Sequence, residues 1–114
     1  MLELIVLSIH EIEAYDGSKA TLEEDTLEHI LRKHSEMIKL LGLTKSELME
    51  KIFNVLKAPG EVYRDACGAK YFIKKLNSLY LNIIVQGGII KTAYLIDSKT
   101  YLRMARIKWL QRLY

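Results

Sequence analysis

The fold is decided by residues 61–96, which read EVYRDACGAKYFIKKLNSLYLNIIVQGGIIKTAYLI. This stretch contains runs of β-branched and aromatic residues, separated by turn signals at Asn77-Ser78 and Gly87-Gly88. Such runs are typical of strands, and paired glycines predict a tight hairpin because glycine tolerates the positive φ of the turn. The pattern predicts a four-stranded antiparallel meander with strands at residues 61–64, 70–76, 79–86 and 89–96.

Two helical patterns precede the meander. Apolar residues spaced by three and four from Leu27 to Leu41 predict a first helix that ends at Gly42. Thr44-Lys45-Ser46-Glu47 matches a capping box, so we expect a second helix to begin there and to stop at Pro59-Gly60.

The two ends of the chain complete the expected architecture. The β-branched run Leu2–Ile9 predicts an N-terminal strand, whereas residues 10–25 are polar and contain a turn signal. Asp97 or Ser98 can cap a basic helix that covers about residues 98–113. We therefore expect one α+β domain over residues 1–114, in which an N-terminal strand and two helices are followed by the meander and a C-terminal helix.

Charge is distributed unevenly along the chain. Residues 1–65 hold 8 Lys/Arg and 13 Asp/Glu, a net charge of −5, whereas residues 66–114 hold 9 Lys/Arg and one acid, Asp97, a net charge of +8. A basic surface attracts polyanions such as nucleic acid. The meander and the last helix are therefore the part of the molecule expected to face RNA.

Composition also bounds the compartment and the cofactors. A single cysteine, Cys67, excludes an intramolecular disulfide, and the longest apolar runs are too short to cross a bilayer. We expect a cytoplasmic protein without a membrane partner. His29 and His34 are five residues apart and lack the i, i+4 spacing of a helical zinc site, so neither a metal nor a cofactor is expected.

Two-residue turns would fix the register of the meander. Lys74 would then lie opposite Leu81, and Ile83 opposite Thr92. Because side chains alternate along a strand, Thr92 and Tyr94 would share a face with Lys74. The sequence leaves open which face meets the helices. It also leaves open the face of Arg64, which depends on the length of the loop that follows this residue.

Basic and aromatic residues are interleaved on the meander. Basic groups neutralise phosphates and aromatic rings stack on bases, so this is the composition of an RNA-facing sheet. A solvated sheet face with half-buried tyrosines would have the same composition. The candidate nucleic-acid-binding residues are Lys70, Lys75, Lys91, Tyr71 and Tyr80, together with Arg103 and Arg106 of the last helix.

His34 is the most informative single residue. It lies in the apolar stripe of the first expected helix, so its ring should point towards the sheet. Histidine is the commonest general acid or base, although a hydrogen-bonded core histidine would occupy the same position. The hydroxyls of Thr92 and Tyr94 point the same way from one strand and could orient a phosphate, or could reflect ordinary strand propensity.

Four short motifs within about residues 26–96 resemble those of one nuclease family. They are His34-Ser35-Glu36, the segment Ala58–Asp65, the strand Tyr71–Lys75, and the hairpin formed by Leu79–Val85 and Ile89–Tyr94. Their order and spacing resemble the phage-type branch of the barnase–EndoU–colicin–RelE-like nuclease superfamily. Ser35 replaces the proline that usually follows the family's histidine.

The resemblance implies a metal-independent endoribonuclease, frequently the toxin of a toxin–antitoxin or phage-conflict system. It also implies helices followed by a four-stranded antiparallel sheet, and an active site that contains His34, Arg64, Lys74, Thr92 and Tyr94. In that site His34 acts on the ribose 2′-hydroxyl, Arg64 and Lys74 stabilise the transition state, and Thr92 positions the phosphate.

Two other functions fit the same residues. A non-catalytic module could bind nucleic acid through the basic half, with His34 playing no part. A protein-interaction module could instead use its basic surface to bind an acidic, antitoxin-like partner. The strand Leu2–Ile9 could also form the edge of a homodimer.

Overall fold

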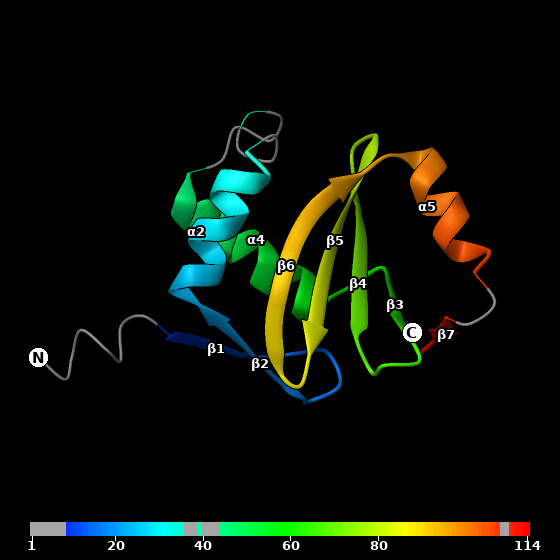
Figure 1. Cartoon of the computed structure of the whole chain (residues 1–114), viewed down its shortest axis with the longest axis horizontal. Coiled ribbons are helices and arrows are strands. Elements are labelled where there is room, and N and C mark those ends of the chain that lie inside the picture. The colour runs from blue at the N-terminus through cyan, green and yellow to red at the C-terminus, as the bar shows by residue number, and fades with distance from the viewer. Residues whose placement is uncertain (1–8, 36–38, 40–43, 108–109) are drawn as a thin grey trace, which may run out of the picture.

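One mixed sheet organises the molecule. The computed structural model describes residues 9–35, 39, 44–107 and 110–114. Within them, seven strands form a single sheet in the order β1-β2-β6-β5-β4-β3-β7, accompanied by helices α2, α4 and α5 (Figure 1). The predicted α+β class is confirmed. The prediction of a four-stranded sheet is wrong, because three further strands extend the meander at both edges.

The meander itself forms the centre of this sheet. Strands β3 (Glu61–Arg64), β4 (Lys70–Leu76), β5 (Leu79–Gln86) and β6 (Ile89–Ile96) have the predicted bounds and pair antiparallel in sequence order. Its two tight turns use positive φ values, 57° at Asn77, 61° at Gly87 and 75° at Gly88. Glycine and asparagine adopt this conformation most readily, which is why these turn signals located the hairpins correctly.

The additional strands arise where the sequence predicted loop or helix. Strands β1 (Ile9–Glu13) and β2 (Lys19–Glu23) form a hairpin inside the stretch interpreted as polar, and β2 runs parallel to β6. Ala20 and Leu22 alternate with the polar residues of β2 and are buried. The predicted strand Leu2–Ile9 lies outside the described residues, apart from Ile9 at the start of β1.

The second predicted helix follows its capping signal, whereas the first does not. Helix α2 (Glu24–Lys33) ends at the C-cap His34, so the predicted continuous first helix from Leu27 to Leu41 is wrong; its predicted end at Gly42 lies outside the described residues. Helix α4 (Lys45–Lys57) begins with the predicted capping box: the Glu47 amide donates to the Thr44 hydroxyl at 3.2 Å, and the Thr44 amide donates to the Glu47 carboxylate at 3.0 Å. None of the described helices is long and apolar enough to cross a membrane.

The last helix is shorter than predicted. Helix α5 (Ser98–Ala105) is capped by Asp97 as expected, but it buries no residue of its own, so no packed apolar face extends it. The chain instead forms strand β7 (Gln111–Arg112) beside β3, and the Leu113 amide donates to the Val62 carbonyl at 2.7 Å. The expected basic helix over residues 98–113 is therefore wrong beyond Ala105.

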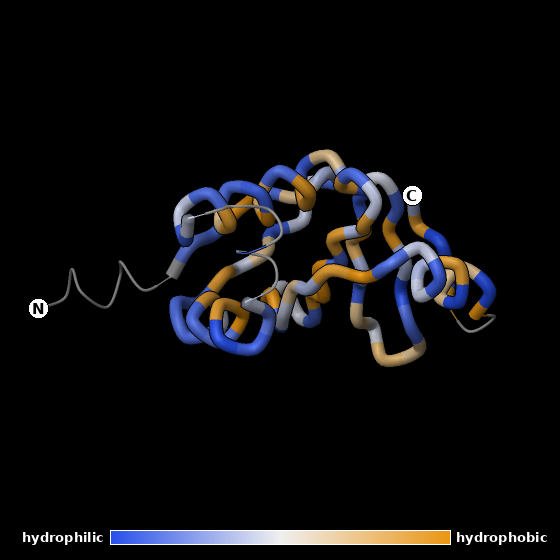
Figure 2. Tube along the Cα trace, turned by 90° about the horizontal axis from the view of Figure 1, so that it is seen from above, coloured by the Kyte–Doolittle hydropathy of each residue, from blue (hydrophilic) through white to orange (hydrophobic). Residues whose placement is uncertain are grey.

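Helix α4 covers one face of the sheet, which we call the helix face, whereas α5 packs against the opposite face, where Tyr101 stacks on Tyr80 (Figure 1). The helix face carries Val62, Phe72, Leu81, Ile83, Val85 and Ala93, all in the hydrophobic core with residues of α2 and α4. In Figure 1, α4 passes behind the strands. Figure 2 shows apolar segments of helices and strands turned towards each other, with hydrophilic segments outside. The other face, which we call the tyrosine face, carries Tyr63, Tyr71, Tyr80, Asn82, Thr92 and Tyr94.

A β-bulge decides which side chains reach the tyrosine face. Lys74 lies opposite Leu81 as predicted, but Ile83 pairs with Ala93 rather than with Thr92. The register shifts next to Ile84 and Val85, which leaves Lys91 as an extra residue in β6. The shift places Thr92 and Tyr94 on the face opposite Lys74, so the predicted shared face is wrong.

Candidate nucleic-acid interface and active site

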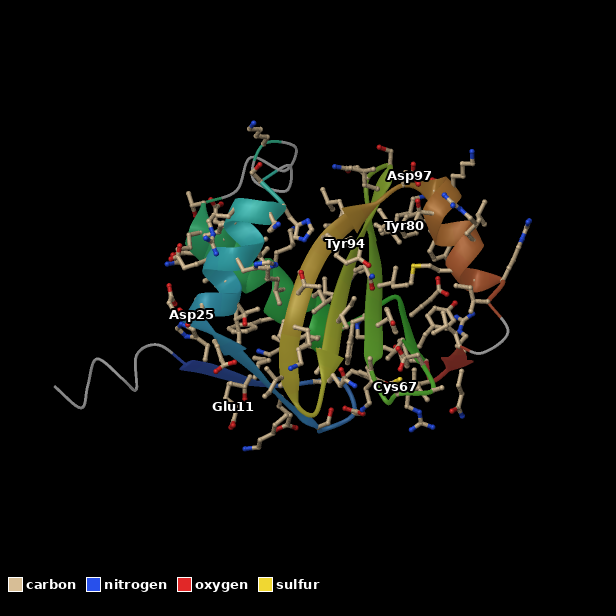
Figure 3. The ribbon with its side chains drawn as sticks, viewed as in Figure 1. Glu11, Asp25, Cys67, Tyr80, Tyr94 and Asp97 are labelled. Carbon is tan, nitrogen blue, oxygen red and sulfur yellow. The ribbon has the colours of Figure 1, made fainter. Side chains whose placement is uncertain are left out.

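His34, at the C-terminal end of α2, lies against the tyrosine face. His34 leaves helical geometry as the C-cap, and its ring centroid lies 5.5 Å from that of Tyr94 with an interplanar angle of 31°. Figure 3 shows Tyr94 between α2 and α5. The expectation that His34 points towards the sheet is confirmed. A half-buried imidazole thus borders an aromatic surface.

A second histidine lies beside the first. The ring centroids of His29 and His34 are 6.5 Å apart, with an interplanar angle of 78°. A spacing of five residues would place them on different faces of a continuous helix, but α2 ends at Lys33, so this argument does not apply to His34. Among the described residues, no group of three or more His, Cys, Asp or Glu side chains is arranged to hold a metal ion.

The hydroxyl of Tyr71 is tied to a carboxylate. It donates to Asp65 Oδ2 at 2.9 Å, and burial together with this bond raises the pKa of Tyr71 to about 12. The same bond, supported by backbone N–H donors, lowers the pKa of Asp65. Tyr71 is therefore a neutral phenol near neutral pH, and Asp65 is a carboxylate.

Two further tyrosines connect α5 to the sheet. The rings of Tyr80 and Tyr101 stack, with centroids 4.1 Å apart and an interplanar angle of 3°. The hydroxyls of Tyr63 and Tyr101 both donate to the Glu61 carboxylate. Burial and this bond raise the pKa of Tyr63 to about 12, and the bond to Glu61, followed by burial, does the same for Tyr101. The sequence analysis did not identify Tyr101, although it lies on the first turns of a helix directly after β6.

The centre of the tyrosine face buries an unusual amide. Asn82 is 0% exposed and lies between Ile73 and Tyr94 in the cross-strand register. Neither polar atom of its side chain has a hydrogen-bond partner among the described residues, and the same is true of Thr92 Oγ1. An orphaned buried polar group costs about 1–3 kcal/mol and marks a place where water or a ligand completes the bonding. The position of Asn82, an amide among the apolar residues of β5, is the feature of the sequence that could have indicated this site.

Two predicted catalytic residues lie away from His34. The Arg64 guanidinium is exposed and donates to Gln111 Oε1 at 2.6 Å. Lys74 lies on the helix face, where its Nζ donates to the Ala58 carbonyl at 2.8 Å. The structure thus brings His34, Tyr94 and Thr92 to the tyrosine face and leaves Arg64 and Lys74 outside it.

Three of the seven predicted nucleic-acid-binding residues lie on the tyrosine face. Tyr71 and Tyr80 belong to it, and the register places exposed Lys75 there as well. The other exposed cations of the set are Lys91 at the bulge, Arg103 in α5 and Arg106 at the end of that helix. Lys70 instead lies on the helix face, with its Nζ 3.6 Å from Asp16 Oδ2.

Comparison with known proteins gives no relative from which a function could be transferred. No family model, no curated protein and no solved structure matches the chain. The function therefore has to be inferred from the chemistry of the tyrosine face and of the histidines beside it.

Proposed function

We propose that the tyrosine face binds single-stranded RNA and that His34 takes part in metal-independent cleavage of the bound strand. The observation that carries this proposal is the 5.5 Å contact between the rings of His34 and Tyr94. The contact puts a side chain suited to proton transfer at the border of an aromatic surface, where a bound nucleotide would expose its sugar and phosphate.

The surface chemistry favours a single strand. Each base that stacks on an aromatic side chain gains about 1–3 kcal/mol, whatever its identity, because every base has a π-face. The rings of Tyr71 and Tyr94 are half-buried and so retain accessible area, whereas the ring of Tyr80 is already stacked on Tyr101. Exposed Lys75 and Lys91 lie beside them and can neutralise backbone phosphates.

Cleavage would follow the 2′-hydroxyl route. The 2′-oxygen attacks phosphorus while the bond from phosphorus to the 5′-oxygen breaks, which gives a 2′,3′-cyclic phosphate and a free 5′-hydroxyl. One group must accept the 2′-hydroxyl proton and one must protonate the 5′-oxygen, and His34 can supply either transfer. Thr92 lies on the same face, but its Oγ1 is buried, so it takes no part in this scheme. The resemblance to toxin-like ribonucleases supports the same reaction.

A second candidate is an RNA-binding module that does not cleave. The positions of Arg64 and Lys74 favour it, because these are the cations to which the resemblance assigns transition-state stabilisation. Both lie away from His34, and both donate hydrogen bonds within the protein.

One experiment separates the two candidates. Purified protein is incubated with single-stranded RNA in EDTA, and the cleavage products and the salt dependence of binding are measured. We expect 2′,3′-cyclic phosphate ends, with the rate reduced about 10²–10⁴-fold in His34→Gln. His10→Gln is the matched control, because it makes the same substitution at a histidine on β1 whose neighbour is Glu24 rather than Tyr94. Salt-dependent binding without cleavage would establish the binding module, and a folded protein that does not bind RNA would contradict both candidates.

A further inference from the structure

Two imidazoles, not one, lie at the C-terminal end of α2. His29 and His34 are both half-buried, and their ring centroids are 6.5 Å apart. The His34 ring centroid also lies 5.5 Å from that of Tyr94, so successive ring contacts link His29, His34 and Tyr94 in a row of rings from α2 to β6. A ligand on this border would meet both histidines.

Cleavage by the 2′-hydroxyl needs two proton-transfer groups at once. In an in-line displacement the attacking and leaving oxygens lie on opposite sides of the phosphorus, and each needs its own partner within about 2.6–3.2 Å. The two partners must therefore be separated by more than a single hydrogen bond. A separation of 6.5 Å between ring centroids meets that requirement, with one oxygen at each imidazole.

Four other titratable groups on or beside the tyrosine face, which are Tyr63, Tyr71, Asp65 and Glu61, are poorly suited to the second transfer. Tyr71 and Tyr63 hold their protons, since the pKa of each is raised to about 12. The hydrogen bond from Tyr71 lowers the pKa of Asp65, which therefore has no proton to donate near neutral pH. Glu61 already accepts hydrogen bonds from two tyrosines.

We propose that His29 and His34 form the acid–base pair of this cleavage, one imidazole accepting the 2′-hydroxyl proton and the other donating a proton to the 5′-oxygen. This inference rests on the proposed function. The new bond joins the 2′-oxygen to phosphorus, the broken bond joins phosphorus to the 5′-oxygen, and the leaving oxygen departs as a hydroxyl. Exchange with water then returns both imidazoles to their starting protonation states.

The test compares His29→Gln, His34→Gln and the double variant on single-stranded RNA in EDTA, with His10→Gln as the matched control. We expect each single variant to lose about 10²–10⁴-fold in rate and the double variant to lose little more, because residues that act as a unit are strongly non-additive. RNA binding and thermal unfolding report whether each variant is folded, and His29→Asn provides a second substitution at the same position.

An RNA in which sulfur replaces the 5′-bridging oxygen gives the readout that a structural role cannot mimic. A thiolate leaves without protonation, so this substrate should rescue the variant that lacks the acid and not the variant that lacks the base. Rescue of one variant alone supports the pair. If His29→Gln retains the wild-type rate while His34→Gln is inactive, the pair is refuted and the proposed function stands. Rescue of both variants or of neither also refutes the pair. If the wild-type protein cleaves no RNA, the proposed function fails and the pair fails with it.

Discussion

The two faces of the sheet are built from the same strands, yet they bury different kinds of side chain. On the helix face, Phe72, Leu81 and Ile83 are at most 1% exposed and join a continuous apolar core. The alternate residues of the same strands lie on the tyrosine face, which buries the Asn82 amide without a hydrogen-bond partner among the described residues and places Tyr94 against a histidine. Because side chains alternate, a sheet can gain its stability on one face and keep polar groups in place on the other.

The largest effect is expected from the helix face. Phe72→Ala should lower the free energy of unfolding by about 3–5 kcal/mol, because it removes a large buried ring and leaves a cavity. Urea unfolding measures the change. Tyr94→Ala is the matched truncation on the other face, and its half-buried ring should cost less. Equal losses would show that both faces contribute equally to stability.

Two neighbouring residues of β5 allow a buried apolar side chain and a buried amide to be exchanged between the two faces. Asn82→Leu should raise the free energy of unfolding by about 1–3 kcal/mol, because it removes an orphaned buried amide at similar volume. Leu81→Asn, the converse change on the helix face, should lower it. Both are measured by urea unfolding. Destabilisation by Asn82→Leu would mean that water already satisfies the amide.

Alkaline pH should act through the tyrosine face. The pKa of each of Tyr63, Tyr71 and Tyr101 is raised from 10.0 to about 12, so the folded protein favours the neutral phenols. Below pH 10 these residues are protonated in both states and their contribution is complete. Between pH 10 and about 12 the unfolded chain loses protons first, so stability should fall as the pH rises. The urea midpoint measured against pH should show this slope, and Tyr71→Phe should make it shallower.

Adjacent lysines of β4 test the proposal that the tyrosine face binds RNA. Lys75 is exposed and shares the tyrosine face, whereas Lys74 lies on the helix face and donates to Ala58. Lys75→Met should weaken binding modestly and reduce the salt slope by about 1, as expected for the loss of one phosphate contact. Lys74→Met should leave the slope unchanged. A reduced salt slope in Lys74→Met with no change in Lys75→Met would instead support the site implied by the family resemblance, which contains Lys74.

The strands of the meander could be predicted because local turn residues mark their boundaries. Asn77-Ser78 and the two glycines mark two-residue turns, and the turns fix where each strand begins and ends. The bulge at Lys91 carries no such mark, since Ile90-Lys91-Thr92 continues an ordinary strand pattern. That single extra residue places Thr92 and Tyr94 on the face opposite Lys74. The predicted site, which needed all three side chains on one face, is therefore not formed, although all four strands were predicted at the right positions.

The remaining differences concern elements that depend on distant partners. Strand β2 is short and polar, and it forms because β1 and β6 flank it, with the Thr21 amide donating to the Gly88 carbonyl at 2.8 Å. Strand β7 likewise exists only beside β3. Local propensity carries no information about such pairing. The closeness of His29 to His34 was missed for a related reason, because it depends on where α2 ends.

The parallel pairing of β2 with β6 has a consequence for the order of folding. The meander consists of hairpins between consecutive strands, whereas Thr21 pairs with Ile89 across most of the chain and must wait for a large loop to close. We expect the meander to form first and the β1–β2–α2 unit to attach afterwards. Native-state hydrogen exchange would test this, with β1 and β2 amides exchanging through smaller openings than those of β5. Since His29 lies in α2 and His34 caps it, the row of rings at Tyr94 would be assembled last and lost first, and the proposed cleavage activity would report on the final step of folding.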